Sequence, residues 1–453
     1  MKINKSQWVR FSIVALLYVL FMIWVGNYWL LLGLPVIVDI YLTKFVPWSA
    51  WKKSENKFLK KTLEWVDAIL FALVAVYIIH LFFFQNYKIP SSSLEKTLLV
   101  GDYLFVSKMS YGPRVPNTPL SFPLAQHTLP ILNCKSYIDW PQWEYRRLKG
   151  FGDVKRNDIV VFNFPAGDTV ALNMQNPDYY TLCHVRGRAA IHTNKKEYGD
   201  IVFRPVDRRE NYVKRCIGMP GDSLMIRNND VFINGELLQE PEHMQLNYLI
   251  YTNGAYITDE QFELLGVSKD DYNKPQVTGL GLLGKQDNFL VYRIPLTRKG
   301  AENIKRFAFV QNVFVEPAPE NDLYYPLGYG ANWNRDNYGP IWIPEKGTTI
   351  VLNENTVALY ERCIVNYEGN TLRKEGDIYL LNGQPANSFT FKYDYYFMMG
   401  DNRHNSADSR SWGFVPEDHV VGKPILVWLS MDKDRSLFKG IRWSRLFTMV
   451  HSD

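Results

Sequence analysis

The chain has little cysteine and almost no excess charge, and both shortages exclude classes of protein. Its four cysteines are widely spaced and form no CxxC pair. Structural zinc sites normally draw on cysteines and histidines at short spacing, so no metal site is expected, and no disulfide can be assigned. The formal net charge is +5, from 51 basic and 46 acidic residues, which gives no reason to expect a nucleic-acid partner.

Aromatic side chains are abundant, and the N-terminal part contains long apolar runs. The 13 Trp, 28 Tyr and 26 Phe suit a β-rich protein that works near a bilayer. The first apolar run covers residues 11–43, and no small-x-small cleavage site follows Trp24, so we interpret the run as a retained membrane segment. One crossing takes about 20 residues, so the run is too long for one and short for two. It is predicted to be a hairpin that turns at Gly26-Asn27 or one long tilted helix, with the hairpin slightly favoured.

A basic stretch over residues 44–61 separates this run from a second apolar run over residues 68–84. Short loops enriched in Lys and Arg stay in the cytoplasm, so the second run is predicted to cross the membrane outward. Residues 1–86 are thus predicted to be a multi-pass anchor in the cytoplasmic (inner) membrane, in contact with the lipid bilayer. Everything from Gln85 onward is predicted to lie outside the cytoplasm.

The rest of the chain is predicted to be a mainly antiparallel β domain. It shows no long helical periodicity, but it has short strand-like runs at residues 158–164, 211–217 and 223–226. Asn-Gly pairs at Asn234-Gly235 and Asn382-Gly383 indicate tight hairpins.

The domain boundaries follow from changes in composition along the chain. Residues 87–235 and 376–436 are assigned to the β core, and residues 236–375, rich in Pro, Gly, Asn and Tyr, to an inserted β-rich subdomain. Residues 113–149 are predicted to be a long loop. Residues 437–453 form a basic and aromatic tail that is predicted either to lie on the membrane surface or to form a terminal helix.

Three consecutive serines, Ser91 to Ser93, stand just beyond the second apolar run. Pro90 disfavours helix for the residue before it, so the chain is expected to leave the membrane extended and to present the serines on a turn. A strand-like run, residues 102–108, follows. A serine held there is chemically interesting only if another group removes its proton.

Lys214 is the candidate base. Alternation along the strand-like run 211–217 places Lys214 and Arg215 on opposite faces, so one can be buried while the other is solvated. Burial lowers the pKa of a lysine, and bringing it from about 10.4 to near neutrality costs roughly 1.4 kcal/mol per unit. A neutral lysine can deprotonate a serine. The alternative is that Lys214 extends into water from an edge strand, and this stretch alone favours that reading.

A third stretch, residues 398–413, is dense in turn formers. Alone, it is predicted to be a hydrogen-bonded surface turn. Its polar side chains also suit a rigid support for a catalytic pair: Asp408 and Arg410 can form an ion pair, and Ser406 can orient a lysine amine.

Taken together, these stretches resemble the bacterial type I signal peptidases, membrane-anchored serine proteases that remove signal peptides. Four blocks occur in the order typical of the family, and one block alone would be far less specific. The matching segments are residues 89–93 with 101–102, residues 152–153 with 158–162, residues 212–215 with 218–222, and residues 400–403 with 405–410 and 412–416.

The resemblance implies a Ser-Lys dyad on a largely antiparallel β fold with a variable β insertion. Ser93 is then the nucleophile and Lys214 the general base. The remaining implied roles are an oxyanion hole from the Ser91 hydroxyl and the Ser93 backbone N–H, positioning of the lysine by Ser406, support by the Asp408–Arg410 ion pair, and pockets for small substrate residues lined by Ile89 and Val213. No cofactor is implied, the partners are secreted preproteins, and no oligomer is required.

The sequence departs from the family pattern at four positions. Leu94 stands where the family usually has methionine and can replace its packing at little cost. Lys96 stands where the family usually has proline, Ser92 where glycine is common, and His404 where an acidic residue is frequent. The choice among the three serines therefore rests on register. The rival interpretations are a Ser-Lys processing protease for a narrow set of substrates and a membrane-anchored scaffold without turnover.

Overall fold

The computed structural model describes residues 4–451, except residues 49, 54, 274, 321–322, 330–332, 433–434 and 436–438. The chain forms two compact units. The first contains Met1–Gln85 and Lys108–Asp153, and the second contains Asn86–Ser107 and Val154–Asp453.

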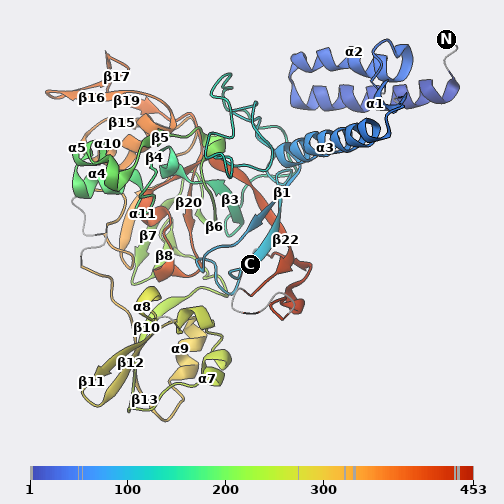
Figure 1. Ribbon diagram of the computed structural model, residues 1–453. Helices are drawn as coiled ribbons and strands as arrows, with labels where there is room; N and C mark the ends of the chain where they lie inside the picture. The colour runs from blue at the N-terminus through green and yellow to red at the C-terminus, as the bar shows by residue number, and fades with distance from the viewer. Residues whose placement is uncertain are drawn as a thin grey trace. The chain divides into compact units, whose positions relative to one another are not determined.

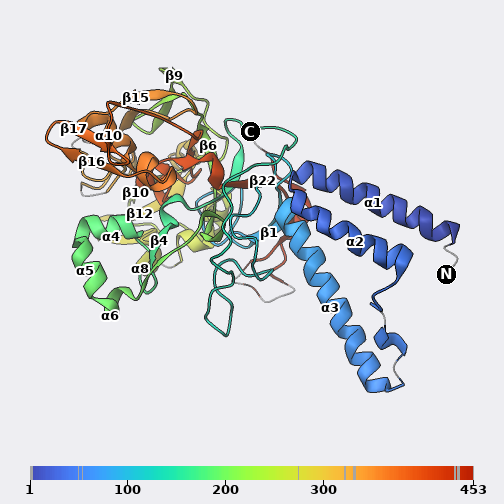
Figure 2. The same cartoon turned by 90° about the horizontal axis from the view of Figure 1, so that it is seen from above.

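The first unit begins with a helical hairpin. Helix α1 (Lys5–Val25) ends at Gly26, whose φ of 63° lies in the left-handed region that glycine adopts without strain. The chain then turns back through η1 (Tyr28–Leu32), α2 (Gly33–Val38) and η2 (Asp39–Thr43). The Tyr18 hydroxyl donates to the carbonyl of Leu30 at 2.6 Å, and α1 and α2 run side by side in both views (Figures 1 and 2). The turn at Gly26 therefore separates two helical arms.

Helix α3 (Lys57–Phe82) is the second long apolar helix and follows the short η3 (Ala50–Lys53). The Asn56 side chain caps it by accepting from two backbone N–H groups. Both α1 and α3 are long and apolar enough to cross a membrane. Phe21 of α1 and Phe82 of α3 pack ring against ring at 5.4 Å, so the C-terminal ends of the two helices lie together.

Residues 115–146 form an irregular hairpin that belongs to the first unit and is called the 115–146 hairpin below. Its base closes where Val115 N–H donates to the carbonyl of Arg146, and bridges at Ser121–Tyr137 and Thr128–Lys135 continue the pairing. The tip is residues 129–134. Sequence analysis predicted a loop over 113–149, and the paired backbone gives that segment a defined shape.

The second unit is built around a curled, largely antiparallel sheet. Its strand order is β1-β2-β22-β3-β6-β20-β21, with β23 paired to β22. The strands are β1 (Phe84–Lys88), β2 (Asp102–Ser107), β3 (Ile159–Asn163), β6 (Asn211–Gly218), β20 (Tyr395–Met399), β21 (Val415–Pro416), β22 (Val420–Ser430) and β23 (Thr448–Met449). Two apolar N-terminal helices followed by such a domain confirm the predicted fold class.

A second sheet, in the order β14-β7-β8-β9, shares a large hydrophobic core with the first. Its strands are β7 (Ser223–Arg227), β8 (Asp230–Ile233), β9 (Glu236–Leu237) and β14 (Tyr338–Trp342). Smaller pairings surround it: β4 (Thr169–Ala171) with β5 (Ile201–Phe203), β15 (Thr349–Val351) with β19 (Ser388–Thr390), and β16 (Leu372–Glu375) with β17 (Ile378–Leu381) and β18 (Gln384–Pro385). The Asn-Gly turns at Asn234 and Asn382 have the positive φ angles that such hairpins need.

Residues 246–315 form a subdomain with a core of its own. Its sheet, in the order β11-β12-β10-β13, contains β10 (Leu246–Thr252), β11 (Gly281–Gln286), β12 (Phe289–Leu296) and β13 (Val310–Val315). Helices α7 (Asp259–Leu264) and α9 (Arg298–Ile304) pack Phe262 and Ile304 into the same core (Figure 1). The predicted insertion, 236–375, is wider, and its later part contributes β14 to the second sheet instead.

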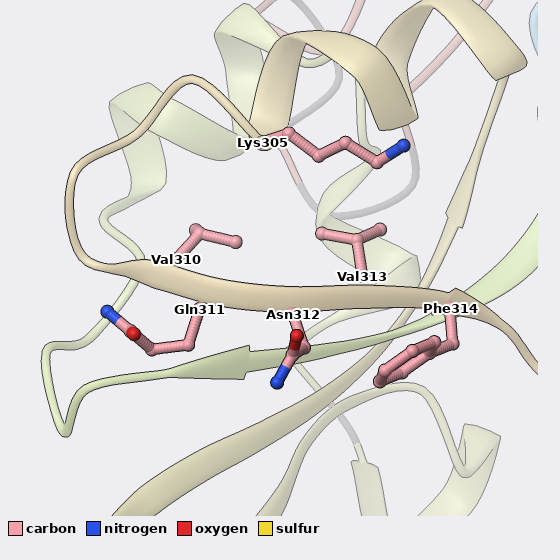
Figure 3. A pocket seen from close by; sticks show the side chains of 6 residues that line it. All are labelled: Lys305, Val310, Gln311, Asn312, Val313 and Phe314. Carbon is pink, nitrogen blue, oxygen red and sulfur yellow. The ribbon is translucent and has the colours of Figure 1, made fainter.

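A hollow of about 240 Å³ lies along the edge strand β13 of this subdomain. Its lining side chains come from β13 and from Lys305 at the end of α9 (Figure 3). None of the candidate site residues from the sequence lines it.

Short helices occur where the sequence predicted none. They are α4 (Tyr179–Arg186), α5 (Arg188–Thr193), α6 (Lys195–Tyr198), α8 (Pro275–Thr278), α10 (Glu354–Arg362) and α11 (Ser409–Trp412). The tail forms a 3-10 turn, η10 (Trp443–Arg445), and the strand β23, so its described residues form no terminal α-helix.

Candidate active site

The serines lie on a turn between β1 and β2. Ile89 and the start of β2 close this turn, because Ile89 N–H donates to the Asp102 carbonyl at 2.8 Å and Gly101 N–H donates to the Ile89 carbonyl at 2.9 Å. Leu94 and Leu98 point into the core and fix the turn from beneath. Ser93 is buried with them, whereas Ser91 is exposed.

Ser93 meets Lys214 at the centre of the sheet. Lys214 lies in β6, whose neighbours are β3 and β20, so it is on an interior strand and not at an edge. Its Nζ lies 2.5 Å from Ser93 Oγ, although the two residues are 121 positions apart in the chain. This is hydrogen-bonding distance, and among the three serines it is the Ser93 hydroxyl that contacts the lysine.

The surroundings of Lys214 favour its neutral form. Burial is the largest influence and lowers the pKa of Lys214 to about 8. The charge of Arg410 acts in the same direction, while Asp408 and Asp401 partly oppose it. A lysine with this pKa is a usable base near neutral pH.

The turn that carries the serines is held by the segment after β20. Asn402 N–H donates to the Ser93 carbonyl at 3.1 Å, and the Asn402 side chain donates to the Ser92 carbonyl at 3.4 Å. Thr97 Oγ1 donates to Asp401 at 2.8 Å. Asp401 in turn accepts two 2.8 Å hydrogen bonds from Arg215, the strand neighbour of Lys214. This buried ion pair therefore links the serine turn to the strand that carries the lysine.

Asp408 and Arg410 form the ion pair expected from the sequence. Arg410 Nε and Nη2 donate to the two carboxylate oxygens at 2.9 and 2.8 Å, and Gly400 N–H donates to the same carboxylate at 3.1 Å. Burial alone would raise the pKa of Asp408, but the charge and hydrogen bonds of Arg410 outweigh it, so the pKa lies below its usual value. Asp408 therefore remains an anion close to the lysine.

Ser406 lies against the serine turn with an unpaired hydroxyl. Its buried Oγ has no hydrogen-bond partner among the described residues. A Cβ on Gly400 would lie 2.4 Å from Ser406 Oγ and 2.6 Å from the Ser93 carbonyl oxygen, so only glycine fits between the two serines. The predicted contact of Ser406 with the lysine amine is not formed in the structure.

The remaining candidate residues are close to the dyad in the fold, and their roles stay predictions. Ile89 is buried in the cluster that contains Leu94, and Val213 packs partly buried against that cluster. The Ser93 backbone N–H and the Ser91 hydroxyl make no hydrogen bond within the described residues. Among those residues, no group of three or more His, Cys, Asp or Glu side chains is arranged to hold a metal ion.

One residue that supports the serine turn, Gln245, was not predicted from the sequence, whereas Lys96 was noted there as a departure from the family pattern. Gln245 directly precedes β10, and its Nε2 donates to the Glu95 carbonyl at 3.2 Å. Its backbone N–H donates to the Asp401 carbonyl, and its own carbonyl accepts from the Arg403 N–H. Lys96 has a φ of 72°, which a proline ring cannot adopt. Lysine in place of the family's proline thus coincides with a backbone conformation that proline cannot adopt, and only the three-dimensional contacts reveal Gln245.

A serine hydroxyl against a buried lysine, in an antiparallel β domain carried by apolar helices, is the arrangement of a membrane-anchored serine hydrolase. Comparison with known proteins identifies the family. The family model described as "Signal peptidase, peptidase S26" matches residues 62–273 and 343–429. The chain belongs to this family, and it is therefore a serine endopeptidase.

Relatives named signal peptidase I match across most of the chain. The protein of Buchnera aphidicola subsp. Acyrthosiphon pisum is 27% identical over 399 residues, which is 87% of this chain and 83% of the relative. That of Haemophilus influenzae is 23% identical over 403 residues, covering 89% and 80%. "Signal peptidase I P" of Bacillus subtilis subsp. natto is 23% identical over 242 residues, covering 51% of this chain and 88% of the relative. The resemblance stated from the sequence is confirmed.

Proposed function

We propose that this protein removes N-terminal signal peptides from exported preproteins, with Ser93 as nucleophile and Lys214 as general base. The observation that carries the proposal is the 2.5 Å separation between Ser93 Oγ and Lys214 Nζ inside a buried site. The family and its relatives named signal peptidase I support the substrate class.

The reaction follows from the two side chains. Neutral Lys214 accepts the proton of Ser93 as Oγ forms a bond to the scissile carbonyl carbon. The tetrahedral intermediate collapses, the carbon–nitrogen bond breaks, and the ammonium of Lys214 returns its proton to the leaving amine of the mature protein. Water, deprotonated by Lys214, then attacks the ester and releases the signal peptide with Ser93 restored.

Recognition of the substrate is assigned to the residues around the dyad. The Ser93 N–H and the Ser91 hydroxyl are proposed to bind the carbonyl oxygen as its negative charge develops. Ile89 and Val213 are proposed to line shallow pockets for small residues at positions one and three before the cut. Ser406 is proposed to turn its unpaired hydroxyl toward the lysine amine once a substrate occupies the site.

The anchor is proposed to hold the catalytic domain on the outer side of the cytoplasmic membrane. The basic stretch 44–61 supports this orientation, since such loops stay in the cytoplasm. A preprotein held in the bilayer by its signal peptide then meets the enzyme in the same membrane, which raises its effective concentration.

The test is cleavage of a defined precursor by the purified full-length protein in phospholipid vesicles. A precursor whose signal ends in Ala-x-Ala should be cut once, after the second alanine, as read by mass spectrometry of the product. A panel of ordinary secretory precursors separates general processing from a narrow substrate set. Absence of any cut over hours would overturn the proposal and favour a catalytically silent scaffold.

A further inference from the structure

The 115–146 hairpin exposes an unusual amount of apolar surface for a segment with paired backbone. Ile131 at its tip is 96% exposed, Leu132 70% and Leu124 72%, and Trp140 near the returning arm is 80% exposed. Leu120, Phe122 and Ile138 are also exposed. Single apolar residues on a surface are common, but such a concentration on one element marks a contact surface.

The charge pattern of the hairpin matches a lipid surface. Residues 115–134 contain no Asp, Glu, Lys or Arg, so the outgoing arm and the tip carry no fixed charge. Basic residues stand at the two ends of this run, at Arg114 and Lys135, and again at Arg146, Arg147 and Lys149. The returning arm also has two acids, Asp139, which pairs with Lys135 at 2.7 Å, and Glu144, so the basic residues outnumber the acidic ones five to two. An apolar tip with a basic rim suits insertion among acyl chains next to anionic headgroups.

The hairpin is also fixed to the ends of the apolar helices within the same unit. Arg146 donates to the carbonyls of Val25 and Gly26 at the end of α1, at 2.7 and 3.1 Å. Trp24 Nε1 donates to the Lys149 carbonyl at 3.2 Å. The base of the hairpin therefore lies at the C-terminal end of α1, which on the proposed topology is where this helix leaves the bilayer.

One further bond shows that the hairpin extends from that surface toward the bilayer. Tyr77 of α3 donates through its hydroxyl to the Pro119 carbonyl at 2.6 Å. Tyr77 precedes the last residue of α3, Phe82, by five positions, which is about 7.5 Å along a helix axis. Helical side chains point back toward the helix N-terminus, so the Tyr77 hydroxyl lies no closer to the surface than its own Cα.

We propose that the 115–146 hairpin inserts its apolar tip into the interfacial layer of the membrane beside α1 and α3. The occupant of its surface is phospholipid. The hairpin cannot lie deep in the hydrocarbon, because its returning arm carries Lys135, Asp139 and Glu144, and charged side chains are costly there. Its expected depth is thus the boundary between headgroups and acyl chains. The proposal holds whether or not the protein cleaves signal peptides, because it rests only on the first unit.

Cys134 provides a native probe at the tip. It is exposed, whereas Cys183 is half-buried and the other two cysteines are buried. The full-length Cys183→Ser variant, labelled at Cys134 with the fluorophore NBD, is placed in vesicles of phosphatidylcholine and phosphatidylglycerol. Quenching is measured with aqueous iodide and with lipids that carry a spin label near the headgroup end or near the end of the acyl chain.

The expected result is blue-shifted emission, weak quenching by iodide and several-fold stronger quenching by the shallow spin label than by the deep one. Iodide quenching equal to that of a free NBD–cysteine adduct would overturn the proposal. A label protected from iodide but insensitive to both spin-labelled lipids would also overturn it, because protein would then cover the tip.

A charge variant and a matched control separate insertion from misfolding. Ile131→Glu with Leu132→Glu should return the label to water, while Leu264→Glu, at another exposed leucine in the second unit, should leave the quenching unchanged. A thermal unfolding midpoint in detergent equal to that of the parent shows that the double variant is folded. An unchanged lipid quenching in the folded double variant would contradict the proposal.

Discussion

The position of Lys214 on an interior strand lowers the pKa of its amine, which suits the amine to act as a base. β6 lies between β3 and β20 in the sheet, Lys214 is only 5% exposed, and the charged form of its amine is therefore disfavoured. Arg215 points to the other face and has its own partner in Asp401. Strand alternation predicted opposite faces for the two cations, but the expectation that one of them is solvated is wrong, because Arg215 is fully buried as well and pairs there with Asp401.

Cleavage should consequently depend on pH through the lysine. With the pKa of Lys214 near 8, the neutral fraction and kcat/KM rise about tenfold per pH unit on the acid side and level off above pH 8. The measurement is kcat/KM of the full-length enzyme against one precursor between pH 6 and 9. A profile that is flat through this range would contradict the role of Lys214 as the base.

Removal of either member of the dyad should abolish cleavage. Ser93→Ala removes the attacking oxygen, and Lys214→Ala removes the proton acceptor, so each is expected to lower kcat by at least a thousandfold. Ser92→Ala is the matched control and should keep activity within a few-fold of the parent. Activity retained in Ser93→Ala but lost in Ser92→Ala would show that Ser92, and not Ser93, is the nucleophile.

Gly400 should tolerate no side chain. In Gly400→Ala the new Cβ would lie 2.6 Å from the Ser93 carbonyl oxygen, so the serine turn has to shift away from the lysine. Overpacking of this kind costs about 1–3 kcal/mol, and a fall in kcat of tenfold or more is expected. Gly152→Ala, whose nearest contact outside its chain neighbours is 4.0 Å away, is the control for precursor cleavage and thermal unfolding. Equal activity of the two variants would show that the turn is not constrained at Gly400.

At the scale of elements, the 246–315 subdomain is connected directly to the catalytic machinery. Its first strand begins at the residue after Gln245, whose side chain and backbone bond to the serine turn and to the segment that carries Asp401. A subdomain that folds around a core of its own is thereby able to hold the nucleophile in place.

Gln245→Ala should therefore impair catalysis more than substrate binding. The variant leaves the Glu95 carbonyl without its amide donor, and an unsatisfied buried group costs about 1–3 kcal/mol. We expect kcat to fall several-fold with little change in KM. Gln286→Ala, on the exposed edge strand β11, is the control. An unchanged kcat in Gln245→Ala would mean that the subdomain does not position the turn.

The sequence predicted secondary structure best where the pattern extends over only a few neighbouring residues. The strand runs at 158–164 and 211–217 became β3 and β6, and both Asn-Gly pairs became hairpin turns, because alternation and turn chemistry act over a few residues. Helix α10 was missed because its apolar residues are few and pack against strands far away in the sequence. Helix α4 packs against close sequence neighbours such as Ala171 and Ile191, but its eight residues are too few to show a helical period.

The dyad was predicted because four sequence blocks match the family pattern in the same order. The contacts around the dyad could not be predicted in this way. No local rule connects Gln245 with Glu95, 150 residues away, or places β14 beside β7. Such pairings depend on how whole strands meet. The insertion boundaries drawn from composition alone therefore did not separate the 246–315 subdomain from β14.

At the scale of the whole molecule, the predicted orientation has a direct test. Protease added to intact spheroplasts should digest the chain beyond Gln85, while an epitope inserted in the basic stretch 44–61 should be protected until the membrane is permeabilised. The physical reason is that positively charged loops resist transfer across the membrane. Digestion of the epitope in intact cells, with the catalytic domain protected, would show the opposite orientation.

The place of β22 in the main sheet has a consequence for a newly made chain. Val420–Ser430 lies between β2, which follows the serine turn, and β3, which pairs with the lysine strand. On the proposed orientation, Ser93 and Lys214 leave the translocation channel before this strand does. The nascent protein is therefore expected to stay inactive until residue 430 has followed.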